Sequence, residues 1–311
     1  MRGLVVALTA LLAGQPAFKS GVDVVRIPVT VMRGGEPAVD GLTAADFSVT
    51  EDGVTQSIAV FERDSMPLSL CIALDVSGSM SESASLAIKA IRNVTAELRS
   101  SDEIALMAFA DGSHVLIPWS APQAATQLAI AAEMGGSTSL HDATRAALDL
   151  LDSARNPRPV VLLITDGFDN SSRTRLTDIV KSRRQSEALV YAFAVVPDRA
   201  ATRVERAGID EPPSYPGGAP FIPLRGSPEI SSVTVLVGDS GGTTYTMANT
   251  GDPARFARRF IDELRNQYTI GYTPAKPFDG KYRRVKVELK KRGYQIRHRG
   301  GYLALPSADR Q

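Results

Sequence analysis

The sequence is poor in the residues on which many metal sites and enzymes depend. Its 311 residues include one cysteine, Cys71, and three histidines, His114, His141 and His298. A single cysteine excludes an internal disulfide and a metal site made of several thiolates. Cys71 lies in the apolar run LSLCIALDV, so we expect it to be a small buried side chain. Few histidines also leave few candidates for a general base.

An excess of charge of either sign is also missing. The 35 lysines and arginines oppose 34 acidic residues, for a formal net charge of +1. The chain therefore has no overall field that would attract nucleic acid, and we expect no nucleic-acid partner. Its 43% hydrophobic and 22% charged residues are typical of a soluble globular protein, and its length suits about two domains.

A long hydrophobic run occurs only at the start of the chain. Met1 and Arg2 precede the apolar stretch GLVVALTALLAG, which Gln15 and Pro16 then interrupt. This pattern predicts a signal peptide over residues 1–20, without an ideal cleavage triplet, because a membrane-spanning helix needs about 20 apolar residues. We expect an exported protein, periplasmic, on the cell surface or secreted, with no transmembrane span after signal removal.

The pattern of apolar and polar residues then changes twice along the chain. Residues 21–65 and 267–305 alternate apolar and polar residues between Gly-Gly and Asp-Gly turns, which is typical of antiparallel strands. Between them, residues 66–266 alternate continuously apolar strands with helical patterns, which predicts a three-layer α/β domain with a mainly parallel sheet. Neither β segment has much surface to bury alone, so we expect the two to form one β-sandwich. Residues 198–228 form a Pro/Gly-rich insert, and 306–311 a short tail.

Three polar stretches follow or precede core elements of the predicted α/β domain. Asp75-Val76-Ser77-Gly78-Ser79 follows the first buried strand, GGSTS at 135–139 precedes a helix, and LITDG at 163–167 ends another strand. Ligands bind at the carboxyl ends of parallel strands, and the tight loop that Gly78 permits lets the two serine hydroxyls converge beside Asp75. Such hard oxygen donors suit Mg²⁺ or another hard divalent cation, such as Mn²⁺ or Ca²⁺.

These three motifs, in this order, resemble the metal-ion-dependent adhesion site of von Willebrand factor A-type (VWFA) domains. The resemblance covers about residues 66–266 and implies a Rossmann-like three-layer fold. It implies that Ser77, Ser79 and Thr138 coordinate the metal and that Asp75 and Asp166 act directly or through water. The sequence departs from the family where Ser137 takes the place of a glycine. The flanking β segments resemble those of the bacterial, acidobacterial-type VWFA-related proteins.

The hydroxyl-rich ligand set predicts a docking site for acids. Neutral hydroxyls leave most of the charge of the cation uncompensated, and the nearby helix N-terminus adds partial positive charge. We therefore expect a non-enzymatic protein that binds an acidic residue of a protein partner through the metal. The insert at 198–228 follows a strand and, if that strand is parallel to those ending in Asp75 and Asp166, emerges on the same face as the metal. Two roles stay open for it, one in shaping the partner surface and one as a disordered spacer.

Three alternatives compete with a metal site. Asp75, Ser77 and Ser79 suit the start of a helix, where they would cap it. A hydrolase would need a base, and His141 beside Asp142 is the best candidate, although VSGSM is not a G-x-S-x-G elbow. The third is a polyanion- or envelope-binding module built on the basic C-terminal β segment, whose residues also suit a solvated strand face that protects a sheet edge. These are Lys281, Arg283, Arg284, Lys286, Lys290, Lys291, Arg292, Arg297 and Arg299.

Overall fold

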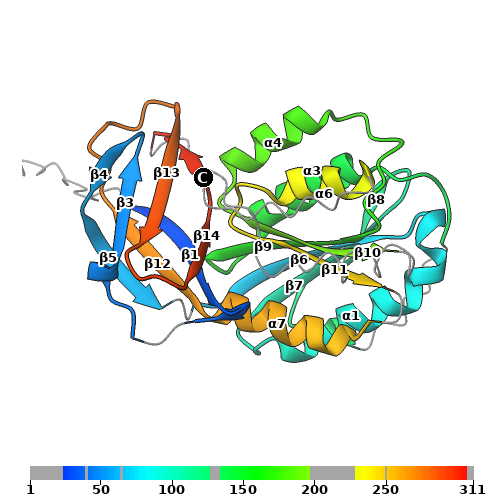
Figure 1. Cartoon of the computed structure of the whole chain (residues 1–311). Helices are drawn as coiled ribbons and strands as arrows, with labels where there is room; N and C mark the ends of the chain where they lie inside the picture. Colours follow the sequence, from blue (N-terminus) through cyan, green and yellow to red (C-terminus); the bar gives the residue numbers. More distant parts are fainter. Residues whose placement is uncertain are drawn as a thin grey trace, which may run out of the picture.

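A computed structural model describes residues 24–38, 41–63, 66–126, 134–196, 228–248 and 251–306 (Figure 1). The predicted signal peptide and residues 198–227 of the predicted insert lie outside these residues. So does most of the helix predicted at 122–133, of which the structure describes α2 (Gln123–Thr126). No helix in the described part of the chain is long and apolar enough to span a membrane.

A six-stranded sheet forms the centre of the larger part. Its order is β11-β10-β9-β6-β7-β8, and every neighbouring pair is parallel except β7 with β8. The strands are β6 (Leu68–Asp75), β7 (Glu103–Phe109), β8 (Ser113–Ser120), β9 (Arg158–Thr165), β10 (Leu189–Val196) and β11 (Thr244–Ala248). The predicted mainly parallel sheet is confirmed.

Helices cover both faces of this sheet (Figure 1). In β6, Leu70 and Ile72 pack into one hydrophobic core, whereas Cys71 and Ala73 pack into a second core on the opposite face. Because successive strand residues point to opposite faces, a strand covered on both sides is apolar throughout. The first core includes α1 (Ala84–Glu97) and α7 (Pro253–Arg265). The second includes α3 (Leu140–Leu150), α4 (Leu176–Gln185) and α6 (Pro228–Val237).

The two predicted β segments pair into one sandwich, as expected. One antiparallel sheet has the order β14-β1-β12-β5, with β2 paired to β1, and the other has the order β15-β13-β3-β4. The N-terminal strands are β1 (Val25–Arg33), β2 (Glu36–Pro37), β3 (Phe47–Glu51), β4 (Val54–Gln56) and β5 (Ile58–Arg63). The C-terminal strands are β12 (Gln267–Tyr272), β13 (Tyr282–Leu289), β14 (Gln295–His298) and β15 (Gly301–Leu303). Their inward side chains, such as Ile27, Val49 and Ile270, share one core.

Buried polar side chains join the sandwich to the α/β part. Arg297 of β14 lies 2.5 Å from Glu263 of α7, and both are almost fully buried. Glu263 also accepts hydrogen bonds from Tyr191 and Tyr245 of the central sheet. Gln267 of β12 accepts one from Arg158 and donates one to Thr30 of β1. The sandwich therefore makes a packed contact with the α/β part.

Candidate metal centre

The candidate site lies at the edge of the central sheet where β6 and β9 end. These strands are neighbours, with Leu74 opposite Ile164, so Asp75 and Thr165 come side by side. The chain leaves β6 toward α1 on one face and leaves β9 toward α4 on the other. Two adjacent strands whose connections diverge form a crevice, which is where open α/β sheets bind ligands.

The first loop presents two hydroxyl groups above a buried carboxylate. Asp75 is fully buried, and its Oδ1 accepts a hydrogen bond of 2.9 Å from the Ser77 backbone N–H. Its Oδ2 accepts one of 2.7 Å from the hydroxyl of Thr165. The hydroxyls of Ser77 and Ser79 lie 3.2 Å apart, and Ser79 is exposed. Asp75 therefore fixes the loop, in which Ser77 is buried and Ser79 is exposed.

The second loop is anchored to the first by its backbone. Gly78 N–H donates to the carbonyl of Gly136 at 3.3 Å, and Gly135 N–H donates to that of Val76 at 2.9 Å. Gly136 has φ of +81°, and a Cβ there would lie 2.8 Å from Asp111 Oδ2. The glycine is therefore required by both conformation and space. Thr138, which follows two residues later, is buried.

Ser137 is tolerated in the place of the family glycine for a clear reason. Only Asp52 and Asp239 have positive φ among the described residues other than glycine, so position 137 does not need the left-handed region. Ser137 is also exposed, and its backbone N–H donates to Asp111 Oδ1 at 2.8 Å. This departure therefore leaves the backbone on either side of it undisturbed.

The third loop joins the second through Asn170. The Asn170 side chain accepts from the Thr138 N–H at 2.7 Å, while the backbone N–H groups of Asn170 and Ser171 donate to the Thr138 carbonyl. Asp166, half-buried at the start of this loop, accepts a hydrogen bond of 3.3 Å from the Phe168 N–H. The structure thus brings all three predicted motifs to one edge and connects them by hydrogen bonds.

The electrostatics of this edge suit a cation. Burial and, to a smaller extent, the nearby charge of Asp166 raise the pKa of the Asp75 carboxyl to about 6, against the hydrogen bonds from Ser77 and Thr165. Two carboxylates with no basic partner in the described loops are costly unless a positive charge compensates them. No group of three or more histidine, cysteine or acidic side chains in the described residues could hold a metal. A cation here would therefore depend on the hydroxyls, which fits the all-oxygen donor set.

The helix-capping alternative is not supported. Ser77 occupies the N-cap position of the 3₁₀ helix η2 (Gly78–Ser83), and Ser83 that of α1, yet neither side chain makes a capping hydrogen bond. The Ser77 hydroxyl contacts that of Ser79 instead. Only Asp75 has an organising role of this kind, through the N–H of Ser77.

His141, in the first turn of α3, contacts the third loop and not the serines. Its Nδ1 lies 3.0 Å from Asp169 Oδ2 and 3.3 Å from the Thr174 carbonyl. Asp142 accepts from the N–H groups of Arg173 and Thr174, which fastens the same loop to the first turn of α3. No hydrogen bond within the described part joins a histidine to Ser77 or Ser79. The arrangement gives a hydrolase no activated serine at this edge.

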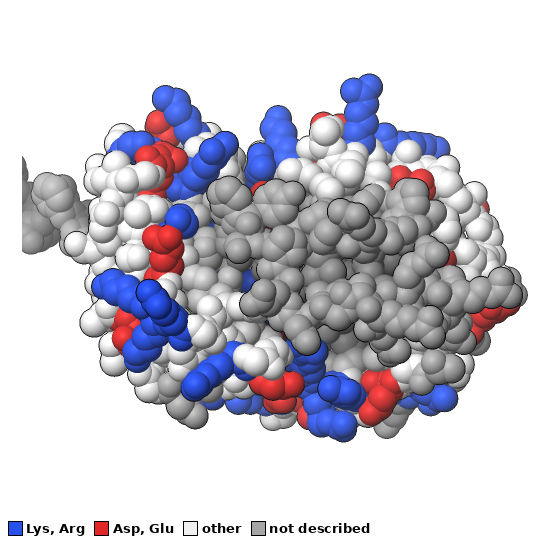
Figure 2. Space-filling model, viewed as in Figure 1, with Lys and Arg blue, Asp and Glu red and all other residues white. Residues whose placement is uncertain are grey.

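The structure divides the basic C-terminal residues into two groups. Arg283, Arg297 and Arg299 are buried, and the first two pair with Glu51 and Glu263. The rest are exposed, and Lys286 and Lys291 pair with acids. Figure 2 shows basic and acidic atoms interspersed on the visible face of the sandwich. Of the strands in this segment, β13 lies between β15 and β3, whereas β14 and β15 lie at the ends of their sheets.

Two structural features of the site were not predicted. Asp111 supports the Gly136-Ser137 turn from the end of β7, and Asn170 joins Thr138 to the third loop. Neither belongs to the three sequence motifs. Thr165, the threonine of the T-D-G motif, was visible in the sequence, and its position next to Asp75 follows from the parallel pairing of β6 and β9. It is not one of the predicted ligands.

The fold and the three loops define a three-layer α/β domain whose polar residues gather at a topological switch point. Residues 70–168 match the family model of the von Willebrand factor type A domain. The chain therefore contains a von Willebrand factor type A domain, with the fold class that the motifs predicted. No curated protein matches the chain.

Several solved structures are similar to this chain. An aerotolerance-related membrane protein from Bacteroides fragilis, with multiple mutations to serines, is 15% identical, with coverage of 63% of this chain and 98% of that chain and a TM-score of 0.45. A von Willebrand factor type A protein from Catenulispora acidiphila is 15% identical, with coverage of 92% and 73% and a TM-score of 0.46. Proximal thread matrix protein 1 from the mussel byssus, with a zinc-occupied MIDAS motif, is 14% identical, with coverage of 69% and 49% and a TM-score of 0.47.

Proposed function

We propose that this edge binds one divalent cation, Mg²⁺ or another hard cation such as Mn²⁺ or Ca²⁺. Ser77, Ser79 and Thr138 would hold the ion with their hydroxyl oxygens, and Asp75 and Asp166 would contribute their negative charge directly or through water. The observation that carries this proposal is the pair of hydroxyls 3.2 Å apart above the buried carboxylate of Asp75. The bound ion would supply an open position that attracts a negatively charged oxygen.

We infer that the ligand of this position is an acidic side chain of a protein partner. Neutral hydroxyls leave the charge of a cation largely uncompensated, and a carboxylate would complete it. Ser79, Gly136 and Ser137 are small exposed residues beside the predicted site, so they leave room for an incoming chain. The protein would act by metal-dependent adhesion or protein–protein interaction and not by catalysis. The N-terminal pattern supports an exported location, in the periplasm, at the cell surface or outside the cell.

A pull-down from an envelope extract tests this function. The full chain is immobilised and offered extract with Mg²⁺ or with a chelator, alongside the Ser79→Ala and Ser85→Ala variants. Ser85 is an exposed serine in the first turn of α1 and outside the predicted ligand set, so it is the matched control. We expect a partner captured by wild type and S85A only with Mg²⁺, and lost in S79A. Capture that is equal with metal, with chelator and in S79A contradicts metal-dependent binding.

A second candidate function uses the exposed basic residues of the sandwich to bind an envelope polyanion. The same captures distinguish it, because such binding depends steeply on salt and not on the chelator. The pairing of Lys286 and Lys291 with Glu288 and Asp46 favours the metal-dependent function.

A further inference from the structure

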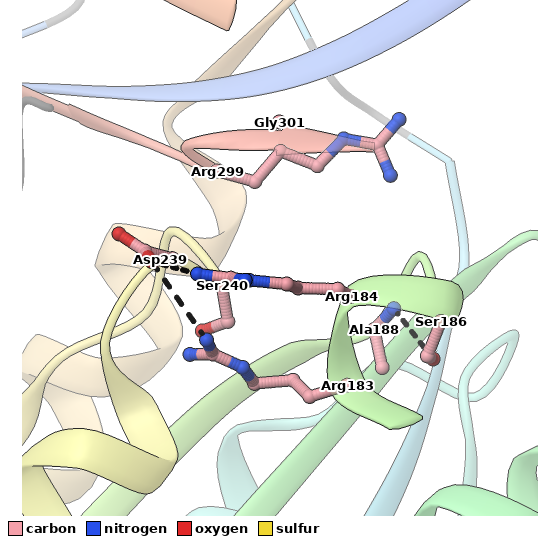
Figure 3. A pocket seen from close by; sticks show the side chains of 8 residues that line it. All are labelled: Arg183, Arg184, Ser186, Ala188, Asp239, Ser240, Arg299 and Gly301. Carbon is pink, nitrogen blue, oxygen red and sulfur yellow. Dashed lines mark hydrogen bonds and ion pairs between the residues drawn. The ribbon is translucent and has the colours of Figure 1, made fainter. Parts of the chain in front are cut away.

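A small pocket lies where the α/β domain meets the sandwich, away from the candidate metal edge (Figure 3). Arg183 and Arg184, in the last turn of α4, line one side of it. Arg299, which follows β14, crosses it on the opposite side. Asp239, in the turn after α6, is the acidic residue among those that line the pocket. Three arginines therefore line the pocket with one carboxylate; the guanidinium groups of Arg183 and Arg184 point toward Asp239, whereas that of Arg299 points away from it.

The acidic groups near these arginines compensate them poorly. Asp239 Oδ2 lies 4.0 Å from Arg183 Nη2 and 3.6 Å from Arg184 Nη2, both beyond hydrogen-bond distance. Glu187 lies 3.7 Å from Arg299 Nη2, but its side chain is 77% exposed, so water screens its charge. Positive charge thus exceeds negative charge at this pocket.

The buried guanidinium groups also have more donors than acceptors. Each carries five N–H donors. Arg183, with a side chain 3% exposed, donates within the described residues to the Leu236 carbonyl at 3.3 Å. Arg299 donates to the Arg26 carbonyl at 3.1 Å, and its buried Nε has no hydrogen-bond partner within the described part of the chain. Unpaired buried donors cost free energy, so an added acceptor would stabilise the pocket.

Burial lowers the pKa of Arg183 although the charge of Asp239 raises it, and the charge of Arg184 lowers it as well. The direction agrees with the geometry, because a guanidinium with a sufficient counter-charge would keep or raise its pKa.

The pocket is held in shape from both parts of the molecule. Gly300 N–H donates to the Asp239 carbonyl at 3.1 Å, and a β-bridge pairs Ser240 with Arg299. The Arg184 guanidinium lies over the Tyr282 ring, 4.9 Å from its centre. These contacts fix the arginines before any ligand arrives, which reduces the cost of binding.

We propose that this pocket binds a small oxyanion of the phosphate class, either inorganic phosphate or a small phosphate monoester. The space inside holds only a water-sized group. The anion therefore binds at the mouth, beside the guanidinium group of Arg184, whose side chain is 44% exposed. Arginine is suited to this because its planar donors match the oxygens of a phosphate.

Binding here would tie the α/β domain to the sandwich. The pocket lies beside the start of β10, whereas the candidate metal site lies at the ends of β6 and β9. These are opposite edges of the same parallel sheet, so the anion site does not depend on the proposed function. A bound anion would stabilise the junction and leave the metal edge free.

Calorimetric titration tests the site on the full chain, with chelator present and with ionic strength held constant by chloride. Inorganic phosphate and glycerol 2-phosphate are titrated separately into wild type, Arg184→Gln and Lys181→Gln. Lys181 is an exposed cation on the same helix outside the pocket, so K181Q removes an equal charge. We expect saturable binding of at least one probe by wild type and K181Q, about tenfold weaker in R184Q. We also expect the bound probe to raise the melting temperature of wild type and K181Q more than that of R184Q.

Two results would overturn the proposal. One is the absence of saturable binding of both probes to wild type. The other is equal weakening in R184Q and K181Q, which would show that only the general charge of the helix attracts the anion. Since the titration contains no free metal, neither result bears on the candidate metal centre.

Discussion

At the residue scale, the candidate metal centre depends on how one glycine and one aspartate shape a turn. Gly136 has a positive φ that side chains rarely adopt, and its α-carbon faces the carboxylate of Asp111. That carboxylate is not free to move away, because it accepts the Ser137 N–H at 2.8 Å. This turn also holds Thr138 against the third loop.

Replacing Gly136 by alanine should therefore damage both the fold and the site. The left-handed backbone alone costs about 1–2 kcal/mol for a side chain other than glycine. We expect Gly136→Ala to lower the free energy of unfolding in urea by about that amount and to weaken cation binding. Ser137→Gly is the matched control, because position 137 has no positive φ, and we expect it to change the free energy of unfolding by less than about 1 kcal/mol. Equal stability of G136A and wild type would show that the turn adapts.

The motifs predicted the parts of the site that are local in sequence. Asp75, Ser77 and Ser79 lie within five residues, so their common loop could be predicted from spacing and from Gly78. Asp111 and Asn170 could not be found in this way, since each acts on a residue more than 25 positions away. Their roles follow from how closely the loops approach one another, which spacing does not encode.

At the scale of elements, His298 connects the two sheets of the sandwich. The Val287 N–H of β13 donates to His298 Nε2 at 3.1 Å, and Nδ1 lies 2.8 Å from the Arg299 carbonyl. The carbonyl can only accept, so Nδ1 carries the proton and Nε2 is the acceptor. Burial lowers the pKa of His298 below its usual 6.5, against its contact with the Arg299 carbonyl and the charge of Asp239. A second proton would disrupt the bond to Val287.

This histidine should make the protein less stable in mild acid. The unfolded chain takes up the proton near pH 6.5, but the folded chain does so only at lower pH. The contribution of neutral His298 to the free energy of unfolding is therefore complete above pH 6.5 and is lost as the pH falls below that value. Between pH 7.5 and 5.5 we expect wild type to lose about 1 kcal/mol more of its free energy of unfolding than His298→Gln, which does not titrate. Urea unfolding of both proteins at the two pH values measures this. Parallel losses would show that His298 is not the titrating group.

The secondary-structure elements and their layers were predicted more reliably than the burial of individual charged residues. The continuously apolar strands and the alternating β segments gave the correct layers, because each pattern reflects which faces are buried. The basic C-terminal residues were expected to be solvated, yet Arg283, Arg297 and Arg299 are internal. Only the fold brings Glu51 and Glu263 to the first two of these arginines.

At the scale of the whole molecule, Arg297 carries the charge that links the sandwich to the α/β domain. It lies beside Glu263, and both groups are excluded from water. A buried ion pair contributes little net stability, because the cost of removing both charges from water offsets their attraction. Removal of one partner leaves the other charge buried without compensation. The link therefore enforces a specific junction.

The variant Arg297→Met should thus be strongly destabilised, by about 3–5 kcal/mol, because Glu263 would remain buried without a counter-charge. Arg292→Gln, at an exposed position between β13 and β14, is the control and should be close to wild type. Urea unfolding followed by far-UV circular dichroism measures the difference. A loss of less than about 1 kcal/mol in R297M would mean that water or other groups reach the carboxylate.

The central claim, that the edge formed by β6 and β9 binds a divalent cation through serine and threonine hydroxyls, is tested most directly by calorimetric titration of Mg²⁺ into the chelator-stripped protein. We predict one ion bound per wild-type chain, unchanged binding by Ser85→Ala, and binding weakened about tenfold or more by Ser79→Ala, since one oxygen ligand is lost. Absence of binding by wild type, or equal affinity of wild type and Ser79→Ala, would contradict the account.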